Sequence, residues 1–170
     1  MELTNGTIKE HPYSRLNYLD EKTPNQITIK RAREITNDSI VIVPKEDPER
    51  DIVCKVINYT RTKTGKLGMP KITITAIGVF DRNTYEHFFY QNQSICFVEL
   101  LYTNYNIVDT KDGFLSLVNN NMNLREDVNI PPNDLGNYII EHLQKGEMVM
   151  CKVATFGNFD DVVEAWVENS

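Results

Sequence analysis

Carboxylates are missing from one long stretch of this chain. The whole sequence is acidic, with 24 Asp and Glu against 18 Lys and Arg, yet neither Asp nor Glu occurs between Asp51 and Asp81. That stretch holds five cations: Lys55, Arg61, Lys63, Lys66 and Lys71. The rest of the chain has 13 Lys and Arg residues and all 24 carboxylates, so a positive segment belongs to an otherwise acidic protein. Such charge separation predicts a polyanion, RNA phosphate above all, as the partner of this segment and not of the whole surface.

Long apolar runs are absent as well. No stretch approaches the length of a membrane span, and the N-terminus lacks the apolar core of a signal peptide. We therefore expect a cytoplasmic protein with no membrane partner.

Cysteine and histidine are scarce. The three cysteines, Cys54, Cys96 and Cys151, are far apart and lie in apolar, strand-like runs. The three histidines show no ligand spacing with them; they are His11, His87 and His142. This pattern predicts buried, reduced thiols and no metal site.

Recognisable catalytic motifs are also missing. No carboxylate pair, thiol–histidine set or serine elbow stands in a context that supports catalysis. Gly65-Lys66 is followed by Leu67, not by the Ser or Thr that a phosphate-binding loop offers to magnesium, and no helical pattern opens after it. We predict that the protein is not an enzyme and has neither catalytic residues nor a cofactor.

The carboxylate-free stretch does contain a lysine punctuated by glycines. Gly65 and Gly68 bracket Lys66, and because glycine tolerates positive φ, the backbone can approach another molecule closely there. The flanking runs 52–59 and 72–80 are apolar and β-branched, and residues 72–75 alternate Ile and Thr. Lysine-rich turns are most often only solvated. This pattern nevertheless predicts a rigid hairpin that presents Lys66 at its apex.

The rest of the chain consists of two sets of short strands. Residues 1–25 are polar and aperiodic, which predicts a flexible arm. The first set, typical of a small five-stranded barrel, covers residues 39–43, 52–59, 72–80, 84–89 and 94–100. The second covers residues 105–109, 113–118, 124–128, 147–155 and 162–167, with a turn signal at Asn119-Asn120-Asn121.

One segment has helical periodicity. After Pro131-Pro132, Asn133 or Asp134 can cap a helix that ends at Gly146. Its apolar face consists of Leu135, Tyr138, Ile139 and Leu143. Five strands with one helix that covers the bottom of the barrel fit an oligonucleotide-binding (OB) fold.

Residues 63–71 read Lys-Thr-Gly-Lys-Leu-Gly-Met-Pro-Lys. They resemble the hairpin Lys-Thr-Gly-Lys-His-Gly-His-Ala-Lys of the eukaryotic translation initiation factor 5A family, the hypusine-containing translation factors. Further motifs in the family's order extend the resemblance over roughly residues 25–168. They are Cys54-Lys55-Val56-Ile57, Asp112-Gly113-Phe114-Leu115-Ser116-Leu117, Arg125-Glu126-Asp127-Val128-Asn129-Ile130-Pro131 and Asp134-Leu135-Gly136.

This resemblance implies a mostly β protein made of two small β-barrels. An SH3-like domain over residues 26–101 would carry the Lys66 hairpin, and an OB-fold with one short helix would occupy residues 102–170. Lys66 would receive a butylamine group from spermidine through deoxyhypusine synthase. Deoxyhypusine hydroxylase would then add the hydroxyl that completes hypusine.

The resemblance further implies a translation elongation factor that binds the ribosome between the exit and peptidyl tRNA sites. The modified lysine would brace the acceptor end of peptidyl-tRNA and promote peptide bond formation, especially at consecutive prolines, and would also aid termination. The residues expected to contact RNA, including rRNA, are Arg61, Lys63, Gly65, Lys66, Leu67, Gly68 and Lys71.

Several positions depart from the family pattern. Leu67 and Met69 stand where the family usually has histidines, and Pro70 replaces a small residue. The family's histidines flank the modified lysine, so this departure bears on the hydroxylation step. Leu67 and Met69 could instead form an apolar tip that packs against a tRNA base or ribose. The connection over residues 44–50 also looks longer than the family's turn.

A second function stays open, that of a general single-stranded RNA-binding protein that uses the OB-fold. Such modules combine a basic groove with several aromatic side chains on adjacent strands. Against eleven carboxylates, residues 104–170 hold only four fixed cations, which are Lys111, Arg125, Lys145 and Lys152. This balance counts against an independent electrostatic grip on RNA.

Overall fold

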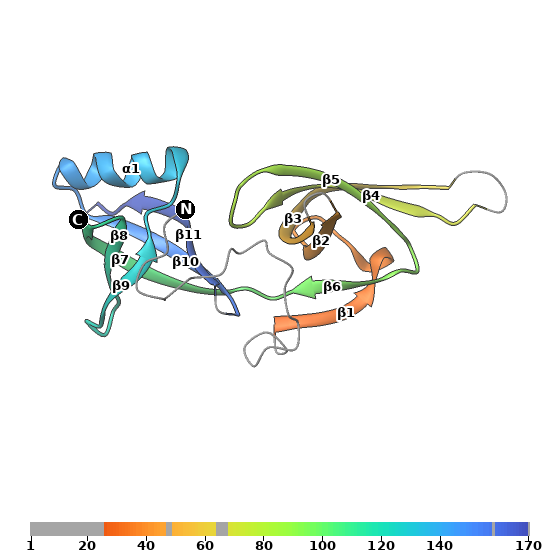
Figure 1. Cartoon of the computed structure of the whole chain (residues 1–170), viewed down its shortest axis with the longest axis horizontal. Coiled ribbons are helices and arrows are strands. Elements are labelled where there is room, and N and C mark those ends of the chain that lie inside the picture. Colours follow the sequence, from red (N-terminus) through yellow and green to blue (C-terminus); the bar gives the residue numbers. More distant parts are fainter. Residues whose placement is uncertain (1–25, 47–48, 64–67, 158, 170) are drawn as a thin grey trace. The chain divides into compact units, whose positions relative to one another are not determined.

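The computed structural model describes residues 26–46, 49–63, 68–157 and 159–169. The chain divides into two compact units with the boundary between Glu99 and Leu100, and each unit is described on its own. Each is built on an antiparallel sheet, and the described residues include one α-helix (Figure 1). The prediction of a mostly β chain with one short helix is confirmed. The predicted arm, residues 1–25, lies outside the described residues.

The first unit contains a six-stranded sheet in the order β1-β6-β2-β3-β4-β5. Its strands are β1 (Ile27–Arg31), β2 (Ile40–Glu46), β3 (Glu49–Thr62), β4 (Lys71–Gly78), β5 (Thr84–Tyr90) and β6 (Ser94–Val98), with the 3-10 helix η2 (Ala32–Glu34) after β1. Five of these strands were predicted, whereas β1 was missed. Most of β1 is exposed, and it is held by pairing with β6, from Ile27 opposite Val98 to Arg31 opposite Ser94.

Alternation of apolar and polar residues builds the core of this unit. Ile72, Ile74 and Ala76 of β4 are fully buried, while Thr73 between them is exposed. Phe89 of β5 pairs with Ile72 and is buried on the same face. Each large apolar side chain buried in this way contributes about 1.5–3 kcal/mol. A one-residue slip would expose the whole set, so burial fixes the register of the β4–β5 pair.

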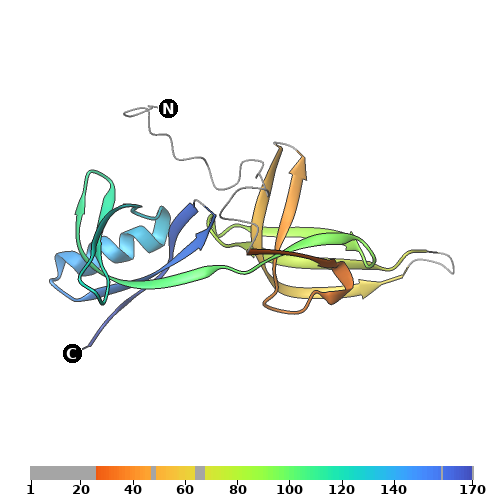
Figure 2. The same ribbon diagram turned by 90° about the horizontal axis from the view of Figure 1, so that it is seen from below.

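Strand β3 takes part in two hairpins. Its first half pairs with β2, and its second half pairs with β4 as far as Thr62 opposite Lys71. A register shift between Val56 and Asn58 leaves Ile57 as an extra residue, and such a bulge bends the strand. The two hairpins accordingly point in different directions (Figure 2). The β3–β4 hairpin is the one that leads toward Lys66.

Residues 44–50 do not form the long connection that the sequence suggested. β2 and β3 stay paired through Pro44 opposite Asp51, Lys45 opposite Arg50 and Glu46 opposite Glu49. The additional residues therefore lengthen a hairpin and not a loop. The turn at residues 47–48 lies outside the described residues.

The second unit contains a five-stranded sheet in the order β11-β10-β7-β8-β9. Its strands are β7 (Leu101–Lys111), β8 (Phe114–Val118), β9 (Leu124–Asn129), β10 (Val149–Phe156) and β11 (Phe159–Val167). All five were predicted. The turn between β8 and β9 is closed by Asn119, whose side-chain oxygen accepts the backbone N–H groups of Asn121 and Asn123.

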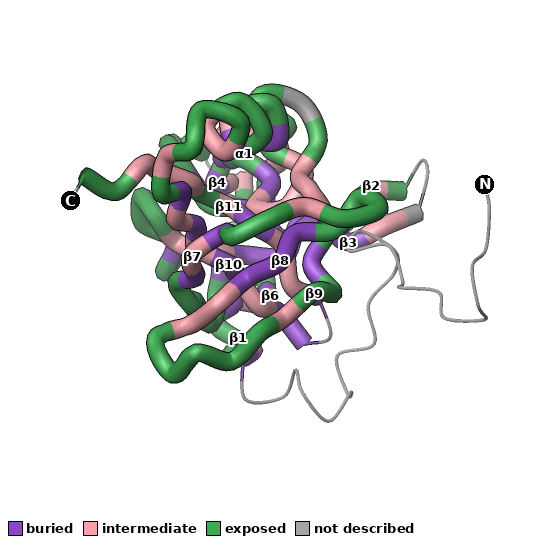
Figure 3. Tube along the Cα trace, turned by 90° about the vertical axis from the view of Figure 1, so that its left-hand side faces the viewer, coloured by how far each residue is buried: buried purple, intermediate pink, exposed green. Residues whose placement is uncertain are grey.

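The helix α1 (Asn133–Gln144) covers one part of this sheet. Ile139 is fully buried in the core cluster of the unit, and Leu135 and Leu143 pack against that cluster, as predicted. Figure 3 shows the buried stretches of β8 and β10, with much of α1 exposed on its outer side. The predicted cap is wrong: the N-cap is Pro132, in an extended conformation and without a side-chain cap bond. Gly146 ends the helix as expected, with φ of +75° and its N–H bonded to the Leu143 carbonyl.

The three cysteines are free thiols, and the predicted burial is confirmed for two of them, Cys54 and Cys151, but not for Cys96. Burial in an apolar core disfavours the thiolate and raises the pKa of both to about 12. Cys96 is half-buried, and desolvation raises its pKa as well. Among the described residues, no group of three His, Cys, Asp or Glu is placed to hold a metal ion, and no helix has the length and hydropathy of a transmembrane span.

Candidate nucleic-acid interface

The described part of the predicted RNA-binding site lies at the end of the β3–β4 stem next to the loop, around the pairs Arg61–Ile72 and Thr62–Lys71. We call this end of the stem the hairpin base. Lys63 and Gly68 are the last described residues on the two arms, and Lys63 is exposed. Gly65, Lys66 and Leu67 lie outside the described residues. The remaining predicted contacts, Arg61 and Lys71, belong to the last paired positions of the stem.

Arg61 and Lys71 lie on opposite faces of the hairpin. Arg61 stands opposite Ile72, whose side chain is buried, so the Arg61 side chain leaves the sheet on the core side. Lys71 stands opposite Thr62, on the outer side. Side chains alternate between the two faces along a strand, so neighbouring cations in the sequence diverge in space. The stem therefore offers positive charge on both faces.

On the core side, Arg61 is held by two contacts. Its guanidinium donates a hydrogen bond to the main-chain carbonyl of Arg33 at 2.8 Å, and it lies 5.9 Å from the ring centroid of Tyr59. One of its five N–H donors is thus used to fix the group, and the others are available to orient toward a phosphate.

Two further arginines, Arg31 and Arg33, join this site from β1 and η2. Arg31 donates a side-chain hydrogen bond to the main-chain carbonyl of Asn92, and Arg33 donates one to the Asn92 side-chain oxygen at 3.4 Å. Both arginines are exposed. The sequence does not associate them with the hairpin, because they lie about thirty residues before it. The alternating run Ile27-Thr28-Ile29-Lys30, a possible strand, was the one available signal.

The β5–β6 turn fixes this arrangement. The N–H of Gln91 bonds the Pro70 carbonyl at the hairpin base, and the N–H groups of Ala32 and Arg33 bond the carbonyls of Gln93 and Gln91, each at 2.9 Å. Main-chain bonds thus join the hairpin, the turn and η2. The arginines are placed by backbone and not by flexible side-chain contacts alone.

On the outer side, Lys71 lies over two aromatic rings of β5. Its Nζ is 4.5 Å from the ring centroid of Phe88 and 5.7 Å from that of Tyr90. The two rings meet edge to face at 5.6 Å. Phe88 and Tyr90 were not predicted as site residues; their spacing of two residues on a strand puts them on one face.

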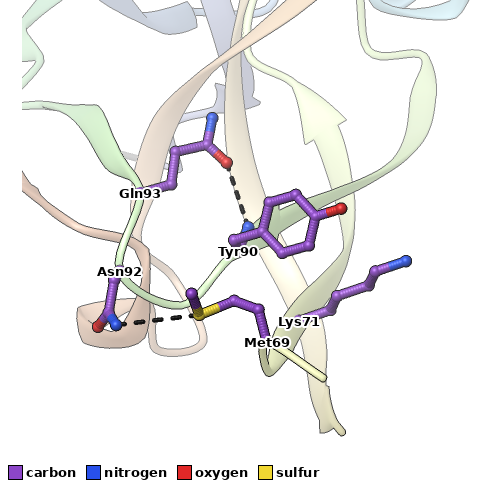
Figure 4. A pocket seen from close by; sticks show the side chains of 5 residues that line it. All are labelled: Met69, Lys71, Tyr90, Asn92 and Gln93. Carbon is purple, nitrogen blue, oxygen red and sulfur yellow. Dashed lines mark hydrogen bonds between the residues drawn. The ribbon is translucent and has the colours of Figure 1, made fainter. Parts of the chain in front are cut away.

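An open hollow of about 700 Å³ adjoins this face (Figure 4). Its lining consists of Met69, Lys71, Tyr90, Asn92 and Gln93. Gln93 accepts the N–H of Tyr90 through Oε1 at 3.1 Å, and the Asn92 amide lies 4.0 Å from the Met69 sulfur. Met69 therefore contributes to the wall of this hollow, at the hairpin base. Met69 is nonetheless 49% exposed, and Leu67 lies outside the described residues, so the apolar tip stays a prediction.

The local charge balance is positive. Glu86, two residues before Phe88 on the exposed face of β5, and Glu34, which accepts the N–H of Arg31, are carboxylates near the site. His87 lies on the other face against Phe89, and desolvation, followed by the charge of Lys45, lowers its pKa. It is therefore neutral at physiological pH, and the cationic character rests on lysine and arginine.

The cations of the second unit are engaged differently. Arg125 pairs with Asp127 at 2.6 Å and with Asp160, which raises its pKa further above the ordinary arginine value. Lys152 pairs with Glu164 at 3.3 Å and Lys145 with Glu141 at 3.7 Å. Three of the four fixed cations of the OB-fold thus face carboxylates of their own unit. This disfavours the interpretation of the chain as a general RNA-binding OB-fold protein.

Comparison with known proteins shows the family of the chain. Residues 102–165 match the family model eIF-5a, described as "Eukaryotic elongation factor 5A hypusine, DNA-binding OB fold". Over 117 residues the chain is 31% identical to eukaryotic translation initiation factor 5A of Dictyostelium discoideum, a match that covers 69% of this chain and 74% of the relative. The chain belongs to the eukaryotic translation initiation factor 5A family. It is a translation factor, as the names of its relatives state.

Two more relatives extend the comparison. The factor 5A of Spodoptera exigua is 31% identical over 101 residues, which cover 59% of this chain and 63% of that protein. A solved structure of a translation initiation factor eif-5a family protein from Naegleria fowleri shares the fold, with a TM-score of 0.69 and 21% identity over 82% of this chain and 98% of that one. The family and the OB-fold expected from the sequence are confirmed.

Proposed function

We propose that this factor 5A family member is a ribosome-binding elongation factor that acts through Lys66 in its modified form. The observation that carries the proposal is the positive hairpin base, where Arg61, Lys63 and Lys71 stand on a stem that leads directly to Lys66. Arg31 and Arg33 add to the same charge through β1 and η2. These residues would contact rRNA and tRNA phosphates and hold the hairpin in place on the ribosome.

The expected modification explains how one side chain could act. Transfer of a butylamine group from spermidine by deoxyhypusine synthase lengthens Lys66 and adds a cationic nitrogen, and hydroxylation adds a hydroxyl. The extended group can reach phosphates and riboses of peptidyl-tRNA that an ordinary lysine cannot. Leu67 and Met69, which replace the family's histidines, would affect recognition by deoxyhypusine hydroxylase and therefore the hydroxylation step.

The physical role is orientation. The ribosome performs the chemistry, while the factor restricts the acceptor end of peptidyl-tRNA between the exit and peptidyl sites. A tenfold rate gain corresponds to only about 1.4 kcal/mol, so a few ordered contacts suffice. Proline benefits most, because its ring fixes φ and makes the nucleophile and the nascent chain hard to align. A similar orientation would aid termination.

Reconstituted translation tests the proposal. Two messages are compared, one with a run of prolines and one with few, in the presence of the modified wild-type factor or Lys66→Arg. Arginine keeps the charge but cannot accept the spermidine-derived extension. The proline-rich message should slow far more than the other with Lys66→Arg. Equal yields of both messages with either factor would contradict the proposal.

A further inference from the structure

We propose that the outer face of β4 and β5 at the hairpin base is a second RNA contact, a stacking site for one unpaired nucleotide. The base would stack on Phe88 or Tyr90, and the phosphate would pair with Lys71. This inference goes beyond the proposed function, which assigns the RNA contact to Lys66 and the hairpin cations. It rests on that function only in the choice of RNA as the ligand.

The aromatic pair is exposed to a degree that packing does not require. Phe88 is 43% exposed and Tyr90 44% exposed, whereas Phe89 between them is 1% exposed and supplies the apolar contact of β5 with the core. Every nucleobase has a π-face, so exposed rings on a strand stack bases with little sequence preference, each worth about 1–3 kcal/mol. The edge-to-face geometry of the pair, at 5.6 Å, turns the two rings in different directions.

Lys71 supplies the charge beside the rings. In the unbound protein its Nζ lies over Phe88 at 4.5 Å, an exposed cation–π contact worth only about 0.5–1 kcal/mol. A phosphate offers the ammonium a stronger, charge-assisted partner. The Lys71 ammonium can therefore move off the Phe88 ring, so that a base stacks there, and pair with the phosphate of the same nucleotide.

The hollow beside Tyr90 supplies polar groups for a base edge. The amides of Asn92 and Gln93 line it, and each carries donors and an acceptor. Gln93 is oriented by its bond to the Tyr90 N–H, while the contact of Asn92 with the Met69 sulfur is weak and easily replaced. Recognition of single-stranded RNA combines this kind of edge contact with stacking on aromatic rings.

Charge favours RNA over a second copy of the chain. β5 is an edge strand of the sheet, so its exposed side could in principle pair with another strand. Such pairing would use the main chain along the edge, whereas the exposed rings and the Lys71 ammonium stand on the outer face of the sheet, where the cation favours a phosphate. Arg61 and Arg33 at the same hairpin base add to the attraction for phosphate.

The experiment uses the full-length, unmodified protein and a labelled RNA of six adenosines at low ionic strength. Affinity is measured for wild type, Phe88→Ala, Tyr90→Ala and the double variant. Tyr102→Ala is the matched control, because Tyr102 is 51% exposed and lies under Lys152 at 5.4 Å, in the second unit. In a separate variant, Tyr90→Trp, quenching of the new indole by RNA reports stacking directly, with native Trp166 as the background.

The double variant should bind the RNA at least about 5-fold more weakly, which is the lower end expected for the loss of one stacked base. Tyr102→Ala should bind the RNA like wild type. In Tyr90→Trp, the RNA should quench the indole fluorescence. Wild-type affinity in the double variant, an equal loss in Tyr102→Ala or an unquenched indole would each overturn the proposal. Light scattering provides a further test. The proposal would also be overturned if the wild-type protein were a dimer, the double variant were a monomer and both bound RNA equally well. Because Lys66 is unmodified throughout, these negative outcomes leave the ribosomal function to its own test.

Discussion

The guanidinium of Arg61 donates a 2.8 Å hydrogen bond to the main-chain carbonyl of Arg33, and so joins the β3–β4 hairpin to η2. This bond orients a cation that would otherwise move freely in solvent. The hairpin base is therefore a preorganised group of charges, and removal of its members should affect binding more than stability.

Replacement of Arg61, Lys63 and Lys71 together by alanine should weaken ribosome binding. It should also flatten the salt dependence of that binding, by up to about one unit of slope for each phosphate that the variant no longer neutralises. Lys55→Ala is the matched control, because Lys55 lies in the same carboxylate-free stretch but pairs with Asp38 at 3.7 Å. Co-sedimentation with ribosomes over a salt series measures the slope. The same slope in the triple variant and Lys55→Ala would show that these cations are only solvated.

Lys66 should be the modified lysine of the hairpin. Peptide mass spectrometry of natively purified protein should find a butylamine-derived addition on Lys66, and none on Lys63 or Lys71. A hydroxyl on the same peptide would show that Leu67 and Met69 are compatible with the second enzyme. Unmodified Lys66 throughout the native material would contradict the expectation.

Gly136→Ala should destabilise the second unit. A Cβ at Gly136 would lie 1.9 Å from the carbonyl oxygen of Pro131, so the backbone before α1 must move. Strain of this kind costs about 1–3 kcal/mol, which outweighs the gain of about 1 kcal/mol from replacing glycine in a helix. Denaturant unfolding followed by Trp166 fluorescence measures the change. Asn137→Ala, at an exposed position of the same helix, should leave the midpoint nearly unchanged; equal midpoints for all three proteins would refute the close contact.

The thiols should differ in reactivity. Cys54 and Cys151, whose pKa values burial raises to about 12, should react with a thiol reagent only after unfolding. Cys96, half-buried and with a raised pKa, should react first in the native protein, faster as pH rises. Because the folded pKa of Cys54 lies above its ordinary value of 9.0, its contribution to stability is present below pH 9 and is lost between pH 9 and 12. Native labelling of Cys54 at the rate of Cys96 would show that the core is open.

Local patterns predicted the strands and the helix well. The alternation in Ile72-Thr73-Ile74-Thr75 indicated β4 because burial on one face imposes that period, and Gly146 marked the end of α1 because its φ is positive. The predicted cap before α1 was wrong, because Pro132 already takes the extended conformation that the N-cap requires. The prediction of a long connection over residues 44–50 was wrong because β2 stays paired with β3 from Pro44 as far as Glu46.

The candidate site could be predicted only where it is local in sequence. The hairpin cations lie in one run and were found from charge alone. Arg31 and Arg33 could not be found in this way. Only the pairing of β1 with β6 and the turn at residues 91–93 bring them to the hairpin base. Phe88 and Tyr90 were interpreted as strand residues. Their exposure on the uncovered face of the sheet, which the sequence does not reveal, distinguishes them from the buried Phe89.

The rate of formation of a single peptide bond shows whether modified Lys66 accelerates the reaction. Ribosomes that carry peptidyl-tRNA ending in proline react with prolyl-tRNA in the presence of wild-type factor modified at Lys66, the same factor unmodified, or Lys66→Arg of equal thermal stability. We expect the modified factor alone to accelerate the reaction by about tenfold or more, equivalent to about 1.4 kcal/mol or more of barrier, with the other two close to the rate without factor. Equal rates with all three proteins would remove Lys66 from the mechanism.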